Sequence, residues 1–365
     1  MVKMKRKQIE KEENIMSRWL IKYLFLGLVL VLILGAGAKP APAVEKPEDF
    51  YKGKMITFMV PFGPGGGYDL WARALAPHIK KHTGATVVVT NMEGAGGLVG
   101  GGWLYHTAKP DGLTIAILNT PGMILAEMLD FEGAKYELAK FSWICRVELN
   151  PTALLASKAS GFKTIEDMQK AVKTIRFTAV DPTTDIAIAS AAIIEAFGLK
   201  AKIIPGYKGA KERMLAILAG READIAIVGL GGEYITMVKQ GDLTLVAMVV
   251  ATRHPEFPEK PTLLEMPGLG AEGKKLLELI NILFASSRMI AAPPRTPEDR
   301  AAFLEKALMA SLNEPALIEW AKKGGRDWAP LSAKESKDLI TKLLEVVPPA
   351  ERPKLKDIFI KKYYY

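Results

Sequence analysis

The sequence predicts an α/β protein with two lobes, each a mostly parallel sheet flanked by helices. Three observations favour this fold class. Strand-like and helix-like segments alternate along nearly the whole chain, which is typical of sheets whose strands are connected by helices. Of the 365 residues, 49% are hydrophobic, so each lobe can bury a core. Several predicted strands end in small or polar residues that lead directly into a helix.

The first set of elements begins with an apolar, partly β-branched strand at 55–61, MITFMVP. Residues 70–81 follow with apolar side chains at helical spacing. The same two patterns predict a strand at 86–91, a helix at 97–107 and a strand at 113–119.

A second set of elements follows, which predicts a lobe of its own. Its strands are expected at 151–157, 175–180, 202–205, 225–230 and 243–251. Its helices are expected at 164–174, 184–197, 210–219 and 233–240. The later elements then return to the first lobe, as a strand at 281–292 and helices at 297–311, 315–324 and 333–346.

These patterns divide the chain into a leader and two lobes. The leader and a short linker occupy 1–43. The first lobe takes 44–147 plus 283–365, and the second lobe takes 148–282. The chain therefore crosses between the lobes twice, and the terminal residues 361–365 are expected to form a frayed tail.

The N-terminus carries the pattern of a secretory signal. Basic residues flank an apolar run at 23–34, and Ala36-Gly37-Ala38 offers a small-x-small cleavage site. The run has about a dozen apolar residues, fewer than the roughly 20 that span a bilayer. We therefore expect export to a periplasmic or other extracytoplasmic location. An uncleaved membrane anchor is the alternative, and either Met1 or Met16 can be the start.

Composition limits the classes of partner. The formal net charge is +9, and residues 1–38 hold seven Lys and Arg against three Asp and Glu. The exported part therefore carries about +5, which favours acidic ligands and does not indicate a nucleic-acid binder. The single cysteine, Cys145, excludes an internal disulfide framework and a cysteine zinc cluster. We expect a monomer with no metal and no cofactor.

The most informative segment is VPFGPGGGYD at 60–69, where a predicted strand runs through glycines into a helix. The first turn of a helix has unpaired N–H groups and a partial positive charge, and glycines let an anion approach them closely. The segment therefore predicts a carboxylate or phosphate site. An ordinary tight turn without a ligand is the alternative.

Nucleotide binding fits this segment poorly. The Walker pattern requires Lys followed by Ser or Thr after its last glycine, and Tyr68-Asp69 stands there instead. The dinucleotide pattern G-x-G-x-x-G also fails, because the third glycine comes one position too soon.

Four more segments repeat the arrangement of a strand that ends in small or polar residues before a helix. They are 91–97 (NMEGAGG), 119–122 (NTPG), 181–184 (DPTT) and 205–209 (PGYKG). Several such turns at the carboxyl ends of strands in a two-lobed chain indicate a ligand cleft.

With these motifs the chain resembles the extracytoplasmic substrate-binding receptors of tripartite tricarboxylate transporters, also called Bug-type or TctC receptors. The resemblance covers nearly all of residues 50–340. Its motifs are PGGG-x-D, N-x-x-GAGG, and YKG with a following L-x-G-x-x-x-D, at 64–69, 91–97 and 207–224. It implies a type II periplasmic-binding-protein clamshell with a ligand cleft between the lobes. It also implies that the protein captures a small organic acid and delivers it to integral membrane subunits.

The resemblance also implies a set of ligand-binding residues. In the first lobe they lie in three turns: Gly65, Gly66, Gly67, Tyr68 and Asp69, then Asn91, Gly94, Ala95 and Gly96, then Thr120. The second lobe offers Thr183, Thr184, Asp185, Tyr207 and Lys208. Receptors of this kind characteristically bind carboxylates through backbone amides and ordered water, without an arginine clamp.

The chain departs from the family pattern at Tyr68 and at the acidic residues Glu93, Asp181 and Asp185. These departures favour a mono- or dicarboxylate over a tricarboxylate. The aromatic or aliphatic body of such a ligand would stack on Tyr68 or Trp71, or an amino group of the ligand would contact Asp185.

Three residues have a structural interpretation beside the functional one. Asp69 suits a ligand contact or a helix cap equally well. Lys208 suits a substrate carboxylate or a structural contact near the hinge. His78 and His82 have metal-ligand spacing, but no third ligand accompanies them, so a solvated helix surface is expected.

Catalysis has little support, because the chain has no G-x-S-x-G elbow, no H-E-x-x-H and only four histidines. Two alternatives to a transport receptor stay open. One is an exported receptor that feeds a sensor kinase. The other is an exported α/β enzyme that uses the glycine turn as an anion site.

Overall fold

The computed structural model describes residues 16, 19–24 and 45–364. The chain separates into two compact units, Met1–Lys46 and Pro47–Tyr365. In the first unit, residues 19–24 are helical. The predicted cleavage site at 36–38 and most of the predicted apolar run lie outside the described residues. Among the residues that are described, no helix is both long enough and apolar enough to cross a membrane.

The second unit contains a six-stranded sheet, sheet A, in the order β11-β4-β10-β3-β1-β2. Its strands are β1 (Met55–Val60), β2 (Thr86–Asn91), β3 (Thr114–Leu118), β4 (Ser142–Leu149), β10 (Met289–Ala292) and β11 (Asp327–Leu331). Strand β1 pairs in parallel with β2 and β3. Strand β10 runs antiparallel to β3 and β4, and β11 runs antiparallel to β4.

Helices cover both faces of sheet A. Successive side chains of a strand point to opposite faces, and apolar side chains on both faces are buried under helices. Phe58 packs into a cluster with Trp71 and Leu304, whereas the next residue, Met59, packs on the other face with Leu104 and Leu125. The first face is covered by α2 (Pro47–Tyr51), α3 (Gly67–Thr83), α11 (Glu298–Leu312) and α12 (Pro315–Lys323). The second face is covered by α4 (Leu98–His106), α5 (Thr120–Met128) and α13 (Ala333–Leu344).

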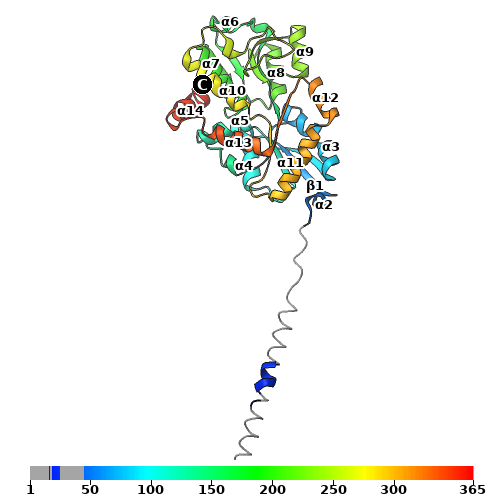
Figure 1. Cartoon of the computed structure of the whole chain (residues 1–365). Helices are drawn as coiled ribbons and strands as arrows, with labels where there is room; N and C mark the ends of the chain where they lie inside the picture. Colours follow the sequence, from blue (N-terminus) through cyan, green and yellow to red (C-terminus); the bar gives the residue numbers. More distant parts are fainter. Residues whose placement is uncertain (1–15, 17–18, 25–44, 365) are drawn as a thin grey trace, which may run out of the picture. The chain divides into compact units, whose positions relative to one another are not determined.

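The same unit contains a five-stranded sheet, sheet B, in the order β7-β6-β8-β5-β9. Its strands are β5 (Thr152–Ser157), β6 (Ile175–Thr178), β7 (Ala201–Ile204), β8 (Ile225–Gly229) and β9 (Leu243–Met248). Its helices are α6 (Ile165–Gln169), α7 (Asp185–Phe197), α8 (Ala210–Ala219), α9 (Gly232–Gln240) and α10 (Ala271–Phe284), at the opposite end of Figure 1 from α3 and α11. The five short 3₁₀ turns are η1 (Ala95–Gly97), η2 (Leu138–Lys140), η3 (Lys158–Ser160), η4 (Leu263–Glu265) and η5 (Pro349–Glu351).

The predicted α/β architecture with two sheets flanked by helices is confirmed, and both sheets are mixed, with parallel and antiparallel neighbours. In sheet B, β6 pairs in parallel with β7 and β8, whereas β5 runs antiparallel to β8 and β9. In sheet A, β10 and β11 run against the other strands, and in sheet B, β5 does; β5 and β10 are the first strands that the chain enters after its two crossings between the sheets. The chain enters such a strand from the other sheet. Its direction is therefore not set by the strand-helix-strand connection that makes neighbouring strands parallel.

The prediction of a strand over 281–292 is wrong in its first half. Residues up to Phe284 continue α10, and only Met289–Ala292 forms a strand. Helix α10 buries Leu276, Ile280 and Leu283, a helical spacing that the apolar run concealed. A short apolar run does not distinguish a buried strand from a buried helix.

One hydrophobic cluster is shared by the two sheets. It contains Met59 and Leu118 from sheet A and Leu154 and Ile227 from sheet B. Helices α5, α7 and α10 contact one another and connect the two sides of this cluster. The sheets are therefore joined by packed side chains as well as by the crossings of the chain.

The C-terminal segment is not a frayed tail. Helix α14 (Arg352–Ile360) packs on α7, and the C-terminus lies beside these helices in Figure 1. The carbonyl of Tyr363 accepts a 2.8 Å hydrogen bond from the amide of Ile203 in the edge strand β7. Lys362 donates to Glu195 at 2.6 Å, and the Tyr363 hydroxyl contacts the same carboxylate. The chain thus ends against the side of sheet B.

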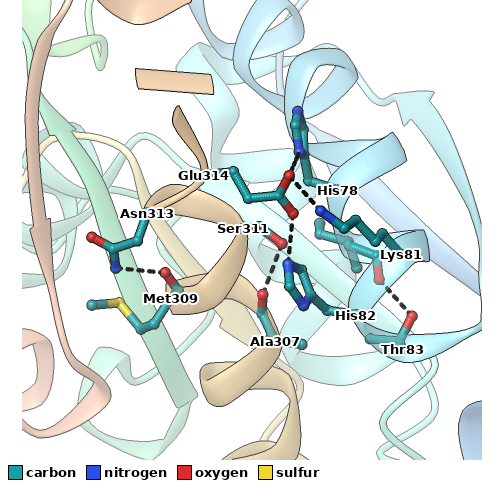
Figure 2. Close-up of polar contacts among 10 residues, drawn as sticks. His78, Lys81, His82, Thr83, Ala307, Met309, Ser311, Asn313 and Glu314 are labelled. Carbon is teal, nitrogen blue, oxygen red and sulfur yellow. Dashed lines mark hydrogen bonds and ion pairs between the residues drawn. The ribbon is translucent and has the colours of Figure 1, made fainter. Parts of the chain in front are cut away.

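The two histidines do not lie on a solvated surface. His78 and His82 of α3 both reach Glu314, the residue that precedes α12, at 3.0 and 2.6 Å (Figure 2). Lys81 donates to the same carboxylate at 3.0 Å. The hydrogen bond from Lys81 and those from the histidines lower the pKa of Glu314 to about 2, against the opposing effect of burial. This cluster therefore ties α3 to α12.

We predict that the double variant His78→Ala, His82→Ala melts at a lower temperature than the wild type, because Glu314 loses two of its three partners. Calorimetry measures the melting temperature, with the exposed His106→Ala as the control. Since neither His78 nor His82 lines the cleft described below, ligand affinity should stay the same. An unchanged melting temperature would show that the cluster does not stabilise the fold.

Candidate ligand-binding cleft

The glycine turn connects β1 to α3, and each glycine has its own requirement. Gly65 adopts a φ of +83°, a conformation that only glycine adopts freely. A Cβ atom on Gly67 would overlap Nη2 of Arg288. Gly66, which precedes the helix, has φ −81° and open space where a Cβ would stand. A positive φ therefore requires glycine at position 65 and not at position 66.

The first turn of α3 is left free by its own side chains. Gly66 is the N-cap residue of α3, and in the described part of the chain no side-chain capping hydrogen bond is formed there. Asp69 instead reaches back and accepts a 2.9 Å hydrogen bond from the amide of Gly65. Since the first N–H groups of a helix have no intrahelical acceptor, the amides that follow Gly65 can bind an anion.

A second layer of side chains holds Asp69. Its carboxylate accepts 2.8 Å and 3.0 Å hydrogen bonds from Arg73 and Asn91, and Asn91 also donates to the carbonyl of Phe62 at 2.8 Å. Burial acts to raise the pKa of Asp69, but these hydrogen bonds and that from Gly65 outweigh it and lower the pKa. Asp69 and Asn91 thus hold the turn in place, which favours the structural interpretation of Asp69.

The turn lines a cleft of about 920 Å³ whose walls come from both sheets. Seven of the predicted site residues line it: Gly65, Gly66, Gly67, Tyr68, Thr184, Asp185 and Lys208. Eight others lie outside its lining: Asp69, Asn91, Gly94, Ala95, Gly96, Thr120, Thr183 and Tyr207. Trp71, expected as a stacking platform, is completely buried in the core and cannot reach a ligand, whereas Tyr68 lines the cleft.

The second predicted loop contacts the opposite wall directly. The hydroxyl of Thr183 donates to the carbonyl of Ala95 at 2.9 Å. A Cβ atom on Gly96 would collide with Thr183 and Thr184, so this glycine permits the close approach. On the far side of the cleft, the amide of Gly232 donates to the carbonyl of Gly324 at 2.8 Å. The two walls therefore already touch at both of these places.

Asp185 and Lys208 are the charged lining residues of the cleft that the sequence predicted, and sequence reasoning missed others. Arg213, Arg288, Arg326 and Glu148 all line it, together with Asn150. Arginine side chains therefore line this cleft, which the resemblance did not imply. One signal was available in the sequence, because Arg288 interrupts the apolar run at 281–292. No local pattern in the sequence indicated that Glu148 would line the cleft.

Arg288 lies at the point where the two crossing segments meet. It precedes β10 and is 6% exposed, and its Nη1 donates to Oδ1 of Asn150 at 3.1 Å. The same nitrogen pairs with the carboxylate of Glu148, which is 1% exposed. Burial lowers the pKa of Arg288 to about 10. Tyr68 opposes this shift, and the nearby positive charge of Arg326 contributes to it. At neutral pH the guanidinium stays charged.

The wall on the side of sheet B carries a second pair of opposite charges. Asp185 begins α7 and is 6% exposed, and Arg213 of α8 is 4% exposed. Burial raises the pKa of Asp185 to about 6, although the amide of Ile186 and the charge of Arg213 act against it. Burial also lowers the pKa of Arg213 to about 10. This wall can therefore offer a carboxyl group in either protonation state near neutral pH.

Residues 71–346 match the model of the TctC family, described as the tripartite tricarboxylate transporter family receptor. The chain belongs to this receptor family. A relative, the UPF0065 protein of the tcbD-tcbE intergenic region in Pseudomonas sp., is 27% identical to the receptor over 286 residues. The match covers 76% of the receptor and 79% of the relative.

Solved structures share the fold of the receptor. The periplasmic binding protein BugD matches with a TM-score of 0.70 at 24% identity, over 84% of the receptor and 98% of BugD. MatC from Rhodopseudomonas palustris, with bound malate, matches with a TM-score of 0.65 at 20% identity, over 81% of the receptor and 99% of MatC. The predicted periplasmic-binding-protein fold is thereby confirmed.

We predict that Asp185→Asn stabilises the receptor at pH 7.5 and not at pH 4. Because the pKa of Asp185 is raised to about 6, the folded state holds this proton more tightly than the unfolded state. The contribution is fully present below about pH 4 and is lost as the pH rises through 6. Asparagine cannot ionise, so the variant should gain up to about 3 kcal/mol relative to the wild type above pH 7.

Denaturant unfolding of both proteins at pH 4 and pH 7.5 measures this difference. Other groups that titrate in this range cancel in the comparison of the two proteins. A difference in free energy of unfolding that does not change with pH would contradict the raised pKa of Asp185.

Proposed function

We propose that the receptor captures a small organic carboxylate outside the cytoplasm and delivers it to the membrane subunits of a tripartite tricarboxylate transporter. The observation that carries this proposal is the uncapped first turn of α3, open to a cleft between two sheets and lined by Gly65, Gly66 and Gly67. Membership of the receptor family supports the transport partner. The bound malate in MatC supports a carboxylate as the ligand.

The expected binding energy is consistent with capture from dilute solution. A charge-assisted hydrogen bond contributes roughly 1.5 to 3 kcal/mol. Three or four of them approach the ~8 kcal/mol of a micromolar complex before the costs of ordering are subtracted. The cleft of about 920 Å³ leaves room for a ligand body that stacks on Tyr68. We propose a mono- or dicarboxylate for this site.

A binding role accounts for the cleft better than catalysis. A nucleophile needs a neighbouring base, and no histidine lines this cleft among the described residues. The buried Cys145 has a pKa raised by burial, so its thiol stays protonated, and it does not line the cleft. No group of three or more His, Cys, Asp and Glu residues in the described part of the chain is arranged to hold a metal ion.

We also propose that each sheet moves with its own helices as a lobe when the cleft opens and closes. The strands of sheet A lie between Met55 and Leu149 and between Met289 and Leu331, whereas those of sheet B lie between Thr152 and Met248. Because α14 packs on α7, we assign the C-terminal helix to the lobe of sheet B. The receptor is proposed to act as a monomer after export.

A thermal-shift screen tests the proposed function directly. Acetate, succinate, malate, adipate and benzoate are added to the receptor, and calorimetry then measures the affinity of the acids that raise the melting temperature. We expect at least one acid to bind with micromolar affinity, without turnover of ester and amide substrates. Turnover without stabilisation by any carboxylate would overturn the proposal in favour of an enzyme.

We predict that Gly66→Val weakens binding of the tightest acid in this panel at least a hundredfold. Valine fits the backbone of Gly66 but places its side chain where the ligand approaches the amides. Losing two charge-assisted hydrogen bonds costs on the order of 3 to 6 kcal/mol. Calorimetry measures the affinity, and circular dichroism verifies folding.

Gly270→Val is the matched control for this substitution. Gly270 also precedes a helix with extended backbone and open space at its Cβ position, but it lies outside the cleft lining. Affinity equal to that of the wild type in a folded Gly66→Val protein would remove this turn from the binding site.

A further inference from the structure

The buried charges beside the first turn of α3 are not balanced. Arg288 and Arg326 both line the cleft there, and Glu148 is the buried carboxylate that faces Arg288. The exposed Glu233 also lines the cleft and acts on Arg326, so the excess of positive charge is confined to the less exposed groups of this corner. The partial positive charge at the start of α3 adds to it. A buried charge without a counter-charge is costly, so this corner is stabilised by an anion.

Both guanidinium groups keep donor capacity in the free cleft. Within the described residues, Nε of Arg288 and Nε of Arg326 are buried and have no acceptor. Arg288 is only 6% exposed, and its Nη2 lies against the backbone of Gly67 in the first turn of α3. Arg326 stacks on Trp320 with its guanidinium carbon 4.6 Å from the ring centre, which holds its position.

We infer, on the basis of the proposed capture of a carboxylate, that Arg288 and Arg326 form a side-chain anion subsite together with the first-turn amides of α3. This subsite holds one carboxylate of the ligand. A planar guanidinium matches the two oxygens of a carboxylate, whereas the amides approach from the backbone side. Gly67 is required because any side chain there would separate the guanidinium of Arg288 from the helix.

Glu148 acts as a positioning residue in this subsite. It forms an ion pair with Nη1 of Arg288, and Oδ1 of Asn150 accepts a hydrogen bond from that nitrogen. These contacts leave Nε and Nη2 for the ligand. Because Glu148 also cancels one positive charge, it lowers the attraction of the subsite for an anion. Removing its charge should therefore strengthen anion binding, whereas removing the charge of either arginine should weaken it.

The experiment measures two probes on six proteins. The probes are sulfate alone, compared with chloride at equal ionic strength by melting temperature, and the tightest acid of the carboxylate panel by calorimetry. The proteins are the wild type, Arg288→Gln, Arg288→Lys, Arg326→Gln and Glu148→Gln. Arg221→Gln is the control, since Arg221 is exposed and lies outside the cleft lining.

We expect Arg288→Gln and Arg326→Gln each to weaken acid binding about 10- to 100-fold and to remove most of the shift caused by sulfate. Arg288→Lys should recover part of the affinity, because it keeps the charge and loses the planar geometry. Glu148→Gln should bind the acid more tightly than the wild type. A purely structural role would instead weaken binding in the Arg288 and Glu148 variants alike.

The outcomes separate this inference from the proposed function. Wild-type affinity for the acid in both folded glutamine variants of the arginines would overturn the subsite and leave the receptor function intact. If no acid binds the wild type but the sulfate shift is lost in those variants, the subsite stands and the carboxylate function fails. If Arg288→Gln does not fold, Arg326→Gln alone decides in the same way.

Discussion

The ion pair between Arg288 and Glu148 joins the two segments by which the chain passes between its sheets. Glu148 lies near the end of β4 on the first passage, and Arg288 precedes β10 on the second. Burying two charges costs several kcal/mol each unless their geometry is good and further hydrogen bonds complete it. Asn150 supplies such a bond, and Gly67 supplies the space in which the guanidinium lies. The position of the glycine turn therefore depends on a contact formed by residues far away in the sequence.

Other contacts limit how the two walls can move. The hydrogen bonds between Thr183 and Ala95, and between Gly232 and Gly324, close the cleft at two separate places. A shared hydrophobic cluster lies behind them on α5, α7 and α10. Because apolar contacts are lost when packed helices separate, opening is cheapest where glycine backbones touch and few side chains interlock. The glycine contact at Gly232 and Gly324 is such a place.

Local patterns predicted the parts of the molecule that depend on neighbours in the sequence. The strand at 55–61, the helix after it and the glycine turn between them were found because each has a signature within about ten residues. The same reasoning failed for 281–292, where one apolar run contains the end of a helix and a separate strand. It also did not predict the antiparallel neighbours in each sheet, because the direction of β5 and β10 depends on the passages between sheets.

The candidate site was predictable only on its backbone side, for the same reason. Three glycines and Tyr68 form a continuous segment, so their place at the cleft could be expected from the sequence. Trp71 is one turn further along α3, where helical periodicity turns it into the core, and this could have been deduced from its spacing. The arginines come from α8, from the segment before β10 and from the segment before β11, so their meeting depends on the tertiary fold.

The two walls of the cleft differ in how they carry charge, and this difference gives the cleft a direction. On the side of α3, the guanidinium groups of Arg288 and Arg326 outnumber the one buried carboxylate, and the exposed Glu233 also acts on Arg326. On the side of α7, Arg213 faces Asp185, whose pKa of about 6 lets it lose or keep its proton near neutral pH. An anion gains most at the first wall, where positive charges exceed negative ones in a medium less polar than water. At the second wall an ionised Asp185 is balanced by Arg213, so the two walls differ in the charge that they offer to the two ends of an asymmetric acid.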